Sequence, residues 1–297
     1  MTEPAPAPAA GSHRCPGRVG IVGLGLIGGS LGLDLQAAGW AVQGIVRSEA
    51  TARRARERGL ATRVDTDPAA LTGCGLVVLA LPLDRLLAPP AALVAALPRE
   101  AVVTDVGSVK APVLALWQDL HPRFVAGHPM AGTAAAGVEA GLPGLFRSRP
   151  WVITPGPRTD PGAIEALERL AEAVGAEVIT AEAATHDRAA ALISHLPVLV
   201  SASLLLAAAD ESDAGVAALA RQLASSGFAD TTRVGGGNPD LGTLMARTNG
   251  TAVLAALRRC RHQLEAIEQL VQDGGWPDLH SALSRAGQER SSFRGCG

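Results

Sequence analysis

The sequence predicts an α/β protein, in which an N-terminal doubly wound (Rossmann) dinucleotide-binding domain precedes an all-α C-terminal dimerisation domain. Three observations support this prediction. Apolar runs alternate with helical patterns in the first half, a glycine-rich turn follows the first run, and only helical patterns follow residue 183. Apolar strands that alternate with helices are typical of a parallel sheet covered on both faces. We expect a disordered tail at 1–17, a dinucleotide-binding domain at 18–182 and a helical domain at 183–297.

The expected strands are short apolar runs, and helical patterns separate most of them. The strands are expected at 18–23, 41–46, 75–82, 101–106, 124–127, 151–155 and 176–180, and helical patterns include 50–59, 85–96 and 161–174. The first strand leads through glycines into a helix that ends near Gly39. This order of elements indicates a doubly wound domain.

The turn after the first strand reads Gly23-Leu24-Gly25-Leu26-Ile27-Gly28, which fits the G-x-G-x-x-G pattern between a strand and a helix. In such a turn Gly23 allows the tight bend, Gly25 lets the backbone approach a pyrophosphate, and Gly28 allows close packing of helix and strand. The first helical N–H groups, from Leu26 onward, would then point at the phosphates. We expect a bound dinucleotide here.

The end of the second strand indicates which dinucleotide binds. An acidic residue is expected about 20 residues after the glycines when the 2′-hydroxyl of NAD is held. This chain has Arg47 and Ser48 there, with Thr51 and Arg53 close behind, and these groups suit a 2′-phosphate. The sequence therefore favours NADP, although Glu49 is near and the arginines could simply be solvated.

The stretch "GHPMAGT" (127–133) follows the apolar run at 124–127. A residue before proline is biased toward extended geometry, so His128 should stand at the mouth of a strand, in a loop of small residues. Its neutral imidazole could accept a proton near pH 7. A structural histidine remains an equally good interpretation of these residues alone.

The second half reads as helices at 185–210, 214–228, 241–274 and 276–290. The most apolar stretch, 189–208, contains His195, Pro197 and three serines, and polar groups are costly in a lipid bilayer. We interpret it as a buried helix rather than a membrane span. Because about 110 residues cannot bury such faces alone, we expect a homodimer.

A glycine-rich loop, 227–242, interrupts these helices and contains Arg233. An arginine fixed there could bind a carboxylate through paired hydrogen bonds. The alternative is an ordinary connection between helices with an exposed arginine.

Composition restricts the partners. Hydrophobic residues make up 47% of the 297 residues and charged residues 18%, the mean hydropathy is +0.22, and the net charge is −2. Such an apolar chain is expected to bury surface against a second copy. The only basic block, 53–58, is too short to indicate a nucleic-acid partner.

The cysteines and the first residues indicate the compartment. Cys15, Cys74, Cys260 and Cys296 lack metal-ligand spacing, so we expect free thiols in a reducing cytoplasm and no metal site. Residues 1–17 are rich in proline and alanine without an apolar run, which is unlike a signal peptide.

Several motifs together resemble the prephenate/arogenate dehydrogenase family of tyrosine biosynthesis. They are "GLGLIGGSL", "TDVGSVK", "GHPMAGT", "ISHLPV", "LASSGF", "DTTRVGGGNP" and a late "W-DLH", in the order of the family from residue 18 to about 280. The glycine run and length look most like the cyanobacterial-type arogenate dehydrogenases. The resemblance implies NADP-dependent oxidative decarboxylation of arogenate to tyrosine, with oxidation of prephenate to 4-hydroxyphenylpyruvate as the alternative.

The resemblance also implies roles for individual residues. His128 would accept the proton of the ring C4 hydroxyl while C4 gives hydride to the nicotinamide. Ser108 would hydrogen-bond near His128, the hydroxyl or the nicotinamide, although serine also often begins a helix. His195 and, more weakly, Ser194 would line the substrate pocket, and Arg233 would pair with a substrate carboxylate.

Asp187, in "THDRA", could pair with a cation in the pocket or merely begin a helix.

Two other functions compete with the oxidative decarboxylation that the resemblance implies. A β-hydroxyacid dehydrogenase would use a lysine of the interdomain helix, but the single lysine, Lys110, lies in the nucleotide-binding half. A non-catalytic dinucleotide sensor is the third interpretation. The joint presence of four polar motif residues argues against it, and these are Ser108, His128, His195 and Arg233.

Overall fold

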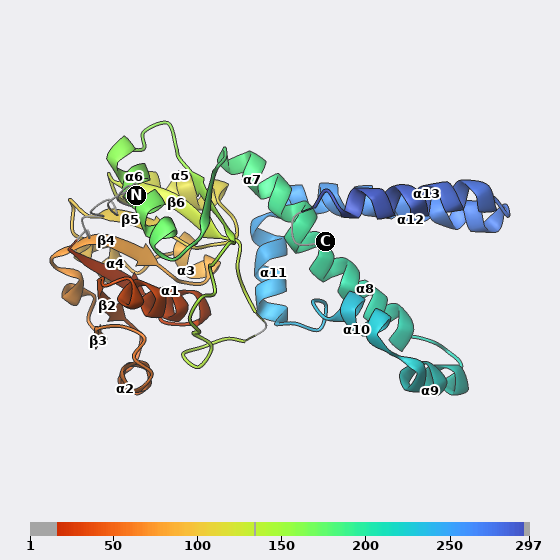
Figure 1. The fold of residues 1–297 in the computed structure, drawn as a ribbon, viewed down its shortest axis with the longest axis horizontal. Helices are drawn as coiled ribbons and strands as arrows, with labels where there is room; N and C mark the ends of the chain where they lie inside the picture. Colours follow the sequence, from red (N-terminus) through yellow and green to blue (C-terminus); the bar gives the residue numbers. More distant parts are fainter. Residues whose placement is uncertain (1–16, 134, 294–297) are drawn as a thin grey trace, which may run out of the picture.

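The computed structural model describes residues 17–133 and 135–293, so the expected tail lies outside the described residues except for Gly17. The chain forms an α/β domain and a helical domain with two arms that diverge from the junction (Figure 1). The helical domain begins with α7 at Ala183, shortly after the last strand of the sheet ends at Thr180.

The α/β domain contains one eight-stranded sheet in the order β3-β2-β1-β4-β5-β6-β7-β8. The strands are β1 (Arg18–Val22), β2 (Ala41–Ile45), β3 (Arg63–Asp65), β4 (Cys74–Leu79), β5 (Val102–Asp105), β6 (Phe124–Pro129), β7 (Pro150–Thr154) and β8 (Glu177–Thr180). The first six strands run parallel, as the alternating pattern predicts. This is a Rossmann arrangement, and its strand order reverses beside β1.

The sheet departs from the predicted one in two places. Strand β7 runs antiparallel to β6, and β8 runs parallel to β7. The reason is the connection from β6 to β7, which contains no crossover helix in its described residues. Strand β3 has only three residues, too few to form a recognisable apolar run.

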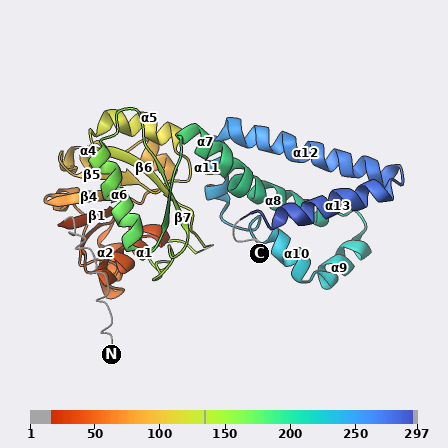
Figure 2. The same ribbon diagram turned by 45° about the horizontal axis from the view of Figure 1, so that its top comes forward.

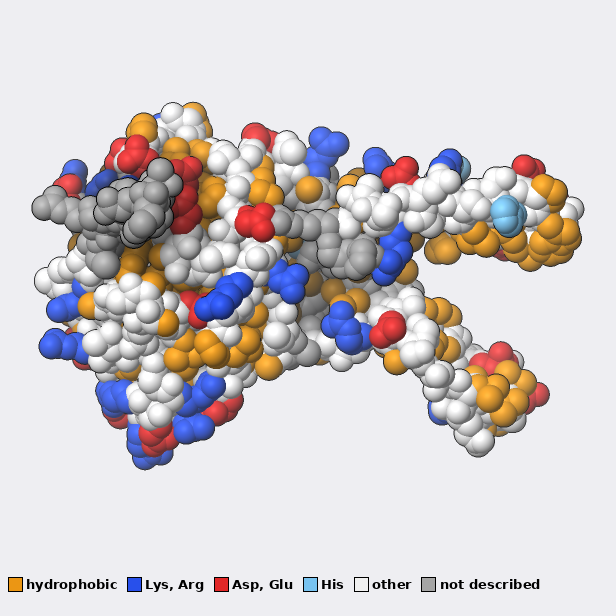
Figure 3. Space-filling model, in the orientation of Figure 1, with side chains coloured by type: hydrophobic (Ala, Val, Ile, Leu, Met, Phe, Trp, Pro, Cys, Tyr) orange, Lys and Arg blue, Asp and Glu red, His pale blue; other side chains and the backbone are white. Residues whose placement is uncertain are grey.

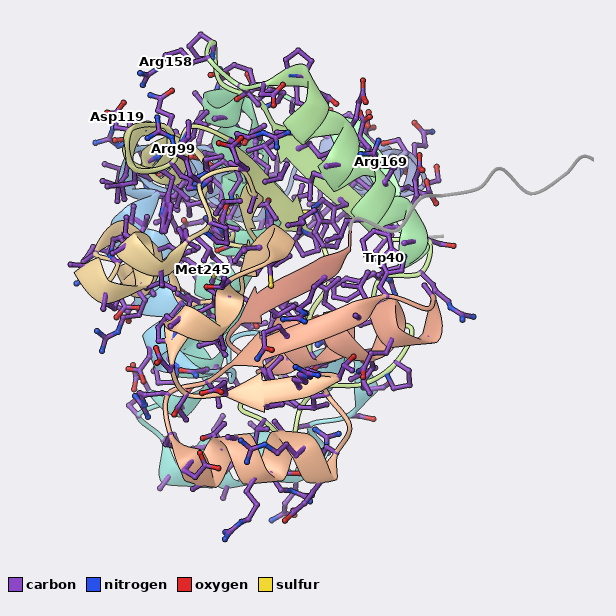
Figure 4. All side chains as sticks on the ribbon, turned by 90° about the vertical axis from the view of Figure 1, so that its left-hand side faces the viewer. Trp40, Arg99, Asp119, Arg158, Arg169 and Met245 are labelled. Atoms are coloured by element: carbon purple, nitrogen blue, oxygen red, sulfur yellow. The ribbon has the colours of Figure 1, made fainter. Side chains whose placement is uncertain are left out.

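Helices cover both faces of the sheet, and each face has its own core cluster. The helical elements of this domain are α1 (Leu26–Ala37), α2 (Glu49–Glu57), η1 (Pro68–Leu71), α3 (Leu83–Leu87), α4 (Ala91–Ala96), α5 (Ala111–Leu120) and α6 (Pro161–Ala173). Helices α1, α2 and α6 supply one cluster, and α3, α4 and α5 supply the other. Figure 4 shows α6 and α2 at opposite ends of the sheet. Trp117 and Trp151 are the largest side chains that are fully buried.

The second half is entirely helical among its described residues. Its elements are α7 (Ala183–Ala190), η2 (Ala191–His195), α8 (Leu196–Ala209), α9 (Ala214–Leu223), α10 (Ser226–Thr232), α11 (Pro239–Thr248), α12 (Gly250–Gln272) and α13 (Trp276–Arg290). Helices α12 and α13 form one arm, and α8, α9 and α10 form the other (Figures 1 and 2). The segment η2 is a π-helical turn between α7 and α8, and such turns are frequent at functional sites.

The two arms leave much apolar surface uncovered. Hydrophobic side chains gather on the side of the α12–α13 arm that faces the other arm (Figure 3). Leu223 is 70% exposed and Leu206 61% exposed, and α13 buries none of its side chains. The run Ala183–Ala209 is long and apolar enough to cross a membrane by length and composition alone. A core of three buried residues, Ala191, Val253 and Ala256, is small for a domain of this length.

Candidate active site

The glycine motif forms a narrow turn with one open position. Gly23 has φ +95°, and a Cβ atom there would lie 2.3 Å from the carbonyl oxygen of Ala80. At Gly28 a Cβ would lie 1.9 Å from the Gly23 oxygen. At Gly25, in contrast, the nearest atom is the Gly137 oxygen at 4.0 Å. The turn therefore excludes side chains where it packs and leaves open space where a pyrophosphate would approach.

Helix α1 begins at this open position. Its N-cap is Gly25, which supplies no side-chain capping bond, so the N–H groups of Leu26 and Ile27 are available for an anion. The segment after β6 lies along α1, because Leu142 N–H donates to Ser30 Oγ at 3.0 Å and Gly144 N–H donates to Asp34 Oδ1 at 2.7 Å. These features fit a dinucleotide.

The end of β2 presents the residues predicted to select the cofactor. Ser48 caps α2, and its Oγ lies 2.9 Å from Thr51 Oγ1. Arg47 is exposed directly after β2 and makes no hydrogen bond or ion pair among the described residues. Glu49 pairs with Arg56 at 2.7 Å, so its carboxylate is already neutralised.

The sequence predicts His128 in a loop at the mouth of the strand, whereas the structure places it within β6. It is placed opposite Val152 of β7, and this antiparallel pairing extends the strand to Pro129. The side chain is 8% exposed, and its Nδ1 lies 2.9 Å from Nε2 of His186. His186 Nδ1 lies in turn 2.8 Å from Asp187 Oδ1. The two imidazoles and the carboxylate form a continuous hydrogen-bonded row.

A buried ion pair fixes the residue before His128. Lys110 and Asp105 pair with their side chains fully buried, and Lys110 Nζ also donates to the Gly127 oxygen at 2.7 Å. Asp105 accepts from the N–H groups of Gly107, at 2.8 Å, and Gly127, at 3.3 Å. Lys110 therefore holds the strand that positions His128.

His195 occupies the last position of η2 and is 1% exposed. Its Nδ1 lies 3.3 Å from Nδ2 of Asn249, which also donates to the Asp187 backbone oxygen at 2.7 Å. The Nε2 of His195 is buried and has no hydrogen-bond partner within the part of the chain that the structure describes. This atom can therefore form a hydrogen bond with a bound ligand.

Burial determines the charge states of both imidazoles. Burial, followed by electrostatic repulsion between a protonated His128 and its neighbours Lys110, His186 and His195, holds the pKa of His128 well below its usual range. Burial also lowers the pKa of His195, against the attraction of Asp187. Both rings are therefore neutral at pH 7, and a neutral His128 can accept a proton.

The remaining predicted residues lie at different distances from this centre. Ser108 is half-buried in the turn after β5, at the same edge of the sheet as His128. Ser194 lies beside His195 in η2 and is half-buried. Arg233 is exposed at the end of α10 and takes part in no hydrogen bond or ion pair between described residues. The single chain therefore does not bring Arg233 into contact with the histidines.

The loop that contains Arg233 is nevertheless fixed. Gly235 N–H donates to Ser201 Oγ at 2.8 Å, and a Cβ on Gly235 would lie 2.3 Å from the Ala202 nitrogen of α8. The backbone next to Arg233 is thus pressed against α8, the helix that follows His195.

Sequence reasoning missed two residues of this centre, His186 and Asn249. His186 stands next to Asp187, for which the sequence suggests either a pocket cation as partner or the start of a helix; the structure places Asp187 inside α7. Asn249 lies where one helix was expected over 241–274, whereas the structure separates α11 from α12 at this residue. The Asn249-Gly250 pair was the available signal, because such pairs mark turns.

Comparison with known proteins gives consistent matches. The model of the prephenate dehydrogenase nucleotide-binding domain matches residues 31–180, and that of the prephenate dehydrogenase dimerization domain matches residues 182–285. A cyclohexadienyl dehydrogenase of Zymomonas mobilis is 31% identical over 87% of this chain and 90% of its own length.

Two solved structures are similar along nearly the whole chain. The arogenate dehydrogenase of Synechocystis has a TM-score of 0.81 and 40% identity, covering 93% of this chain and 99% of that one. The prephenate dehydrogenase of A. aeolicus, solved with hydroxyphenyl propionate and NAD+, has a TM-score of 0.86 and 27% identity, covering 93% and 98%.

Proposed function

This chain belongs to the prephenate dehydrogenase family, and we propose that it is an arogenate dehydrogenase that converts arogenate to tyrosine with NADP. The observation that carries the proposal is the placement of His128. Its ring is buried and neutral, and the residue lies near the carboxyl end of β6, at the sheet edge where doubly wound domains bind their ligands. His195, with an unpartnered Nε2, is electrostatically coupled to His128 and so lies in the same site.

The protein positions the substrate and moves one proton. His128 accepts the proton of the ring C4 hydroxyl through Nε2, because Nδ1 already faces His186. Bound NADP would supply the oxidising power by accepting hydride from C4. The resulting ketone is conjugated with the two ring double bonds that flank the carbon bearing the ring carboxylate. When carbon dioxide leaves that carbon, the electron pair of the broken bond passes through the ring to the ketone oxygen, and the ring becomes aromatic. His195 donates from Nε2 to an oxygen of the substrate.

The proton balance explains why the base can be buried. Oxidation transfers the hydroxyl proton to His128, and loss of carbon dioxide leaves a negative charge on the same oxygen. His128 then returns the proton to that oxygen, which completes the phenol. Because the proton leaves and returns at one atom, the reaction requires no proton channel to solvent.

The NADP preference rests on the end of β2. Arg47 is free to bind a 2′-phosphate, Ser48 and Thr51 offer hydroxyls beside it, and the carboxylate of Glu49 is paired with Arg56. No acidic side chain follows β2 directly to hold a ribose 2′-hydroxyl.

We choose arogenate because the similar structure from Synechocystis is an arogenate dehydrogenase. Prephenate is the second candidate because the similar structure from A. aeolicus is a prephenate dehydrogenase. The two substrates share the ring carboxylate and hydroxyl. They differ in a side chain that has an ammonium group in arogenate and a keto group in prephenate. Arg233 would pair with a carboxylate of either one.

We further propose that the protein is a cytoplasmic homodimer built through the helical arms. Leu206, Leu223 and Leu264 are each more than half exposed in one chain, and a second copy would cover them. The run Ala183–Ala209 would then be an interface helix rather than a membrane span. In the dimer Arg233 would also reach a substrate site.

One assay tests the function directly. Purified protein is mixed with arogenate or prephenate and with NADP or NAD, and the absorbance of the reduced nicotinamide is followed while products are separated by chromatography. We expect the highest kcat/KM for arogenate with NADP, with tyrosine and carbon dioxide in equal amounts. Cofactor binding without turnover of either substrate would contradict the proposal and favour a dinucleotide sensor.

A further inference from the structure

Asp187 joins four groups from three parts of the molecule. Its carboxylate accepts from Lys110 N–H at 2.7 Å and from Ala111 N–H at 2.9 Å, at the start of α5. The same carboxylate faces His186 Nδ1, and the backbone oxygen of Asp187 accepts from Asn249. The side chain is 5% exposed. Asp187 thus lies between the two imidazoles of the site, and the mechanism above does not use it.

The donors around Asp187 determine the direction of each hydrogen bond toward His128. The Asp187 side chain accepts two backbone N–H groups, and it also acts as the acceptor toward His186. His186 must therefore donate from Nδ1, and in a neutral imidazole this leaves a lone pair on Nε2. The contact at 2.9 Å then requires His128 to donate from Nδ1. His128 consequently presents a lone pair at Nε2.

The other imidazole is set in the opposite way. Asn249 uses Nδ2 to donate to the Asp187 oxygen, and the second hydrogen of the same amide is directed at His195 Nδ1. An imidazole that accepts at Nδ1 has its proton on Nε2. That Nε2 is the buried atom without a partner among the described residues. His195 consequently presents an N–H group.

We propose that Asp187 fixes the two active-site imidazoles in opposite tautomers, His128 through His186 and His195 through Asn249. His128 Nε2 is then an acceptor and His195 Nε2 a donor before the substrate arrives. A substrate hydroxyl can donate to the first atom, and a substrate oxygen can accept from the second. This inference rests on the proposed function in taking His128 as the base, and it makes His186, Asp187 and Asn249 positioning residues.

The substitution Asp187→Asn tests this arrangement. Asp187 Oδ1 accepts from Lys110 N–H and faces His186 Nδ1, whereas Oδ2 accepts from Ala111 N–H. With its amide oxygen in the Oδ2 position, the asparagine would still accept from Ala111 N–H, lose the Lys110 bond and donate from its nitrogen to His186 Nδ1. His186 would then have its proton on Nε2 and donate to His128, which would move the His128 proton to Nε2 and block the base. By analogy with other histidine bases held by a carboxylate, we expect kcat to fall about 10²- to 10⁴-fold while KM for NADP stays within about threefold.

The tautomers can be read without any substrate. Two-bond ¹⁵N–¹H correlation spectra of the full-length protein with ¹⁵N-labelled histidine distinguish Nδ1–H from Nε2–H in each ring. We expect Nδ1–H for His128 and Nε2–H for His195 in the wild type, and Nε2–H for His128 in Asp187→Asn. The signals of exposed His262 serve as an internal reference and should not change.

A second pair of variants leaves the hydrogen bonds from Asp187 to the start of α5 in place and changes only His186. His186→Gln keeps an oxygen that can accept from His128 Nδ1, whereas His186→Leu removes it, and neither touches Asp187. We expect the glutamine variant to retain the Nδ1–H form of His128 and at least tenfold more activity than the leucine variant. Equal activities of the two variants, or Nε2–H on His128 in the wild type, would overturn the inference. If neither substrate were turned over, the proposed function would fail while the spectra still decided the tautomers.

Discussion

A side chain on Gly28 would collide with the carbonyl oxygen of Gly23, because a Cβ atom there would lie only 1.9 Å from that oxygen. The same atom would lie 2.9 Å from the Ala80 side chain. Gly28 therefore serves the packing of α1 against the turn. Gly25 differs, since the space before it is open.

This difference predicts opposite outcomes for two alanine variants. Gly28→Ala should lower the free energy of unfolding by about 1–3 kcal/mol, because the crowded turn must shift. Gly25→Ala should leave the melting temperature within about 2 °C and raise KM for NADP at least tenfold, because its methyl group takes the space of the pyrophosphate. Thermal unfolding and cofactor titration measure both. Equal stabilities of the two variants would contradict the assignment.

Removal of the proposed base should stop turnover and spare cofactor binding. His128→Asn keeps a polar side chain of similar shape but cannot accept the proton, so kcat should fall about 10²- to 10⁴-fold. The Kd for NADP, measured by titration calorimetry, should remain within about threefold. Turnover near the wild-type rate would reject the assigned role.

The pH profile should place the acid limb at an unusually low pH. His128 must be neutral to accept a proton, and its pKa lies well below the usual 6.5 because of burial and of electrostatic repulsion by its neighbours. As the pH falls, kcat/KM, which reports the free enzyme, should therefore stay constant through 6.5 and decline only below it. Initial rates between pH 5 and 9 measure this, with circular dichroism to show that the fold persists. A decline centred at or above pH 6.5 would contradict the buried site.

The cofactor preference should depend on Arg47. Arg47→Ala removes one charge-assisted contact to a 2′-phosphate, so KM for NADP should rise about tenfold or more while KM for NAD changes little. Arg99→Ala is the matched control. It lies before β5, at the opposite edge of the sheet from the end of β2, and should change neither constant (Figure 4). A parallel loss for both cofactors would contradict 2′-phosphate recognition.

The ion pair beneath β6 should contribute strongly to stability. Lys110→Met leaves the Asp105 carboxylate buried without its partner, which should cost about 3–5 kcal/mol of unfolding free energy. Arg158→Ala breaks the exposed pair with Asp119, visible side by side in Figure 4, and should cost less than about 1 kcal/mol. Urea unfolding of both variants gives the comparison. A small cost for Lys110→Met would show that Asp105 is satisfied by its backbone donors alone.

Local patterns predicted much of this molecule. The Rossmann fold, the helical second half and the family follow from alternating apolar runs and from motifs such as "GHPMAGT", and the comparisons confirm them. The roles given to His128, Ser108 and Arg233 stay predictions. What the sequence could not predict depends on contacts between distant residues. His186 meets His128 across 58 positions, and Asn249 meets Asp187 across 62.

Three further differences concern strand pairing and a helix break. The reversal of β7 depends on a connection without a helix, and the extension of β6 through His128 depends on pairing with β7. Neither leaves a trace in the periodicity of one segment. The break at Asn249 was overridden by the strong helical pattern on both sides.

The burial of Lys110 has a practical consequence, because it is the only lysine in the chain. Acylating reagents that modify lysine find none on the surface of the folded protein. Modification of Lys110 therefore requires the nucleotide-binding domain to open, and its rate, followed by mass spectrometry, records how often a molecule does so. The rate of Lys110 acylation thus reports the opening of this domain, and bound dinucleotide should lower that rate.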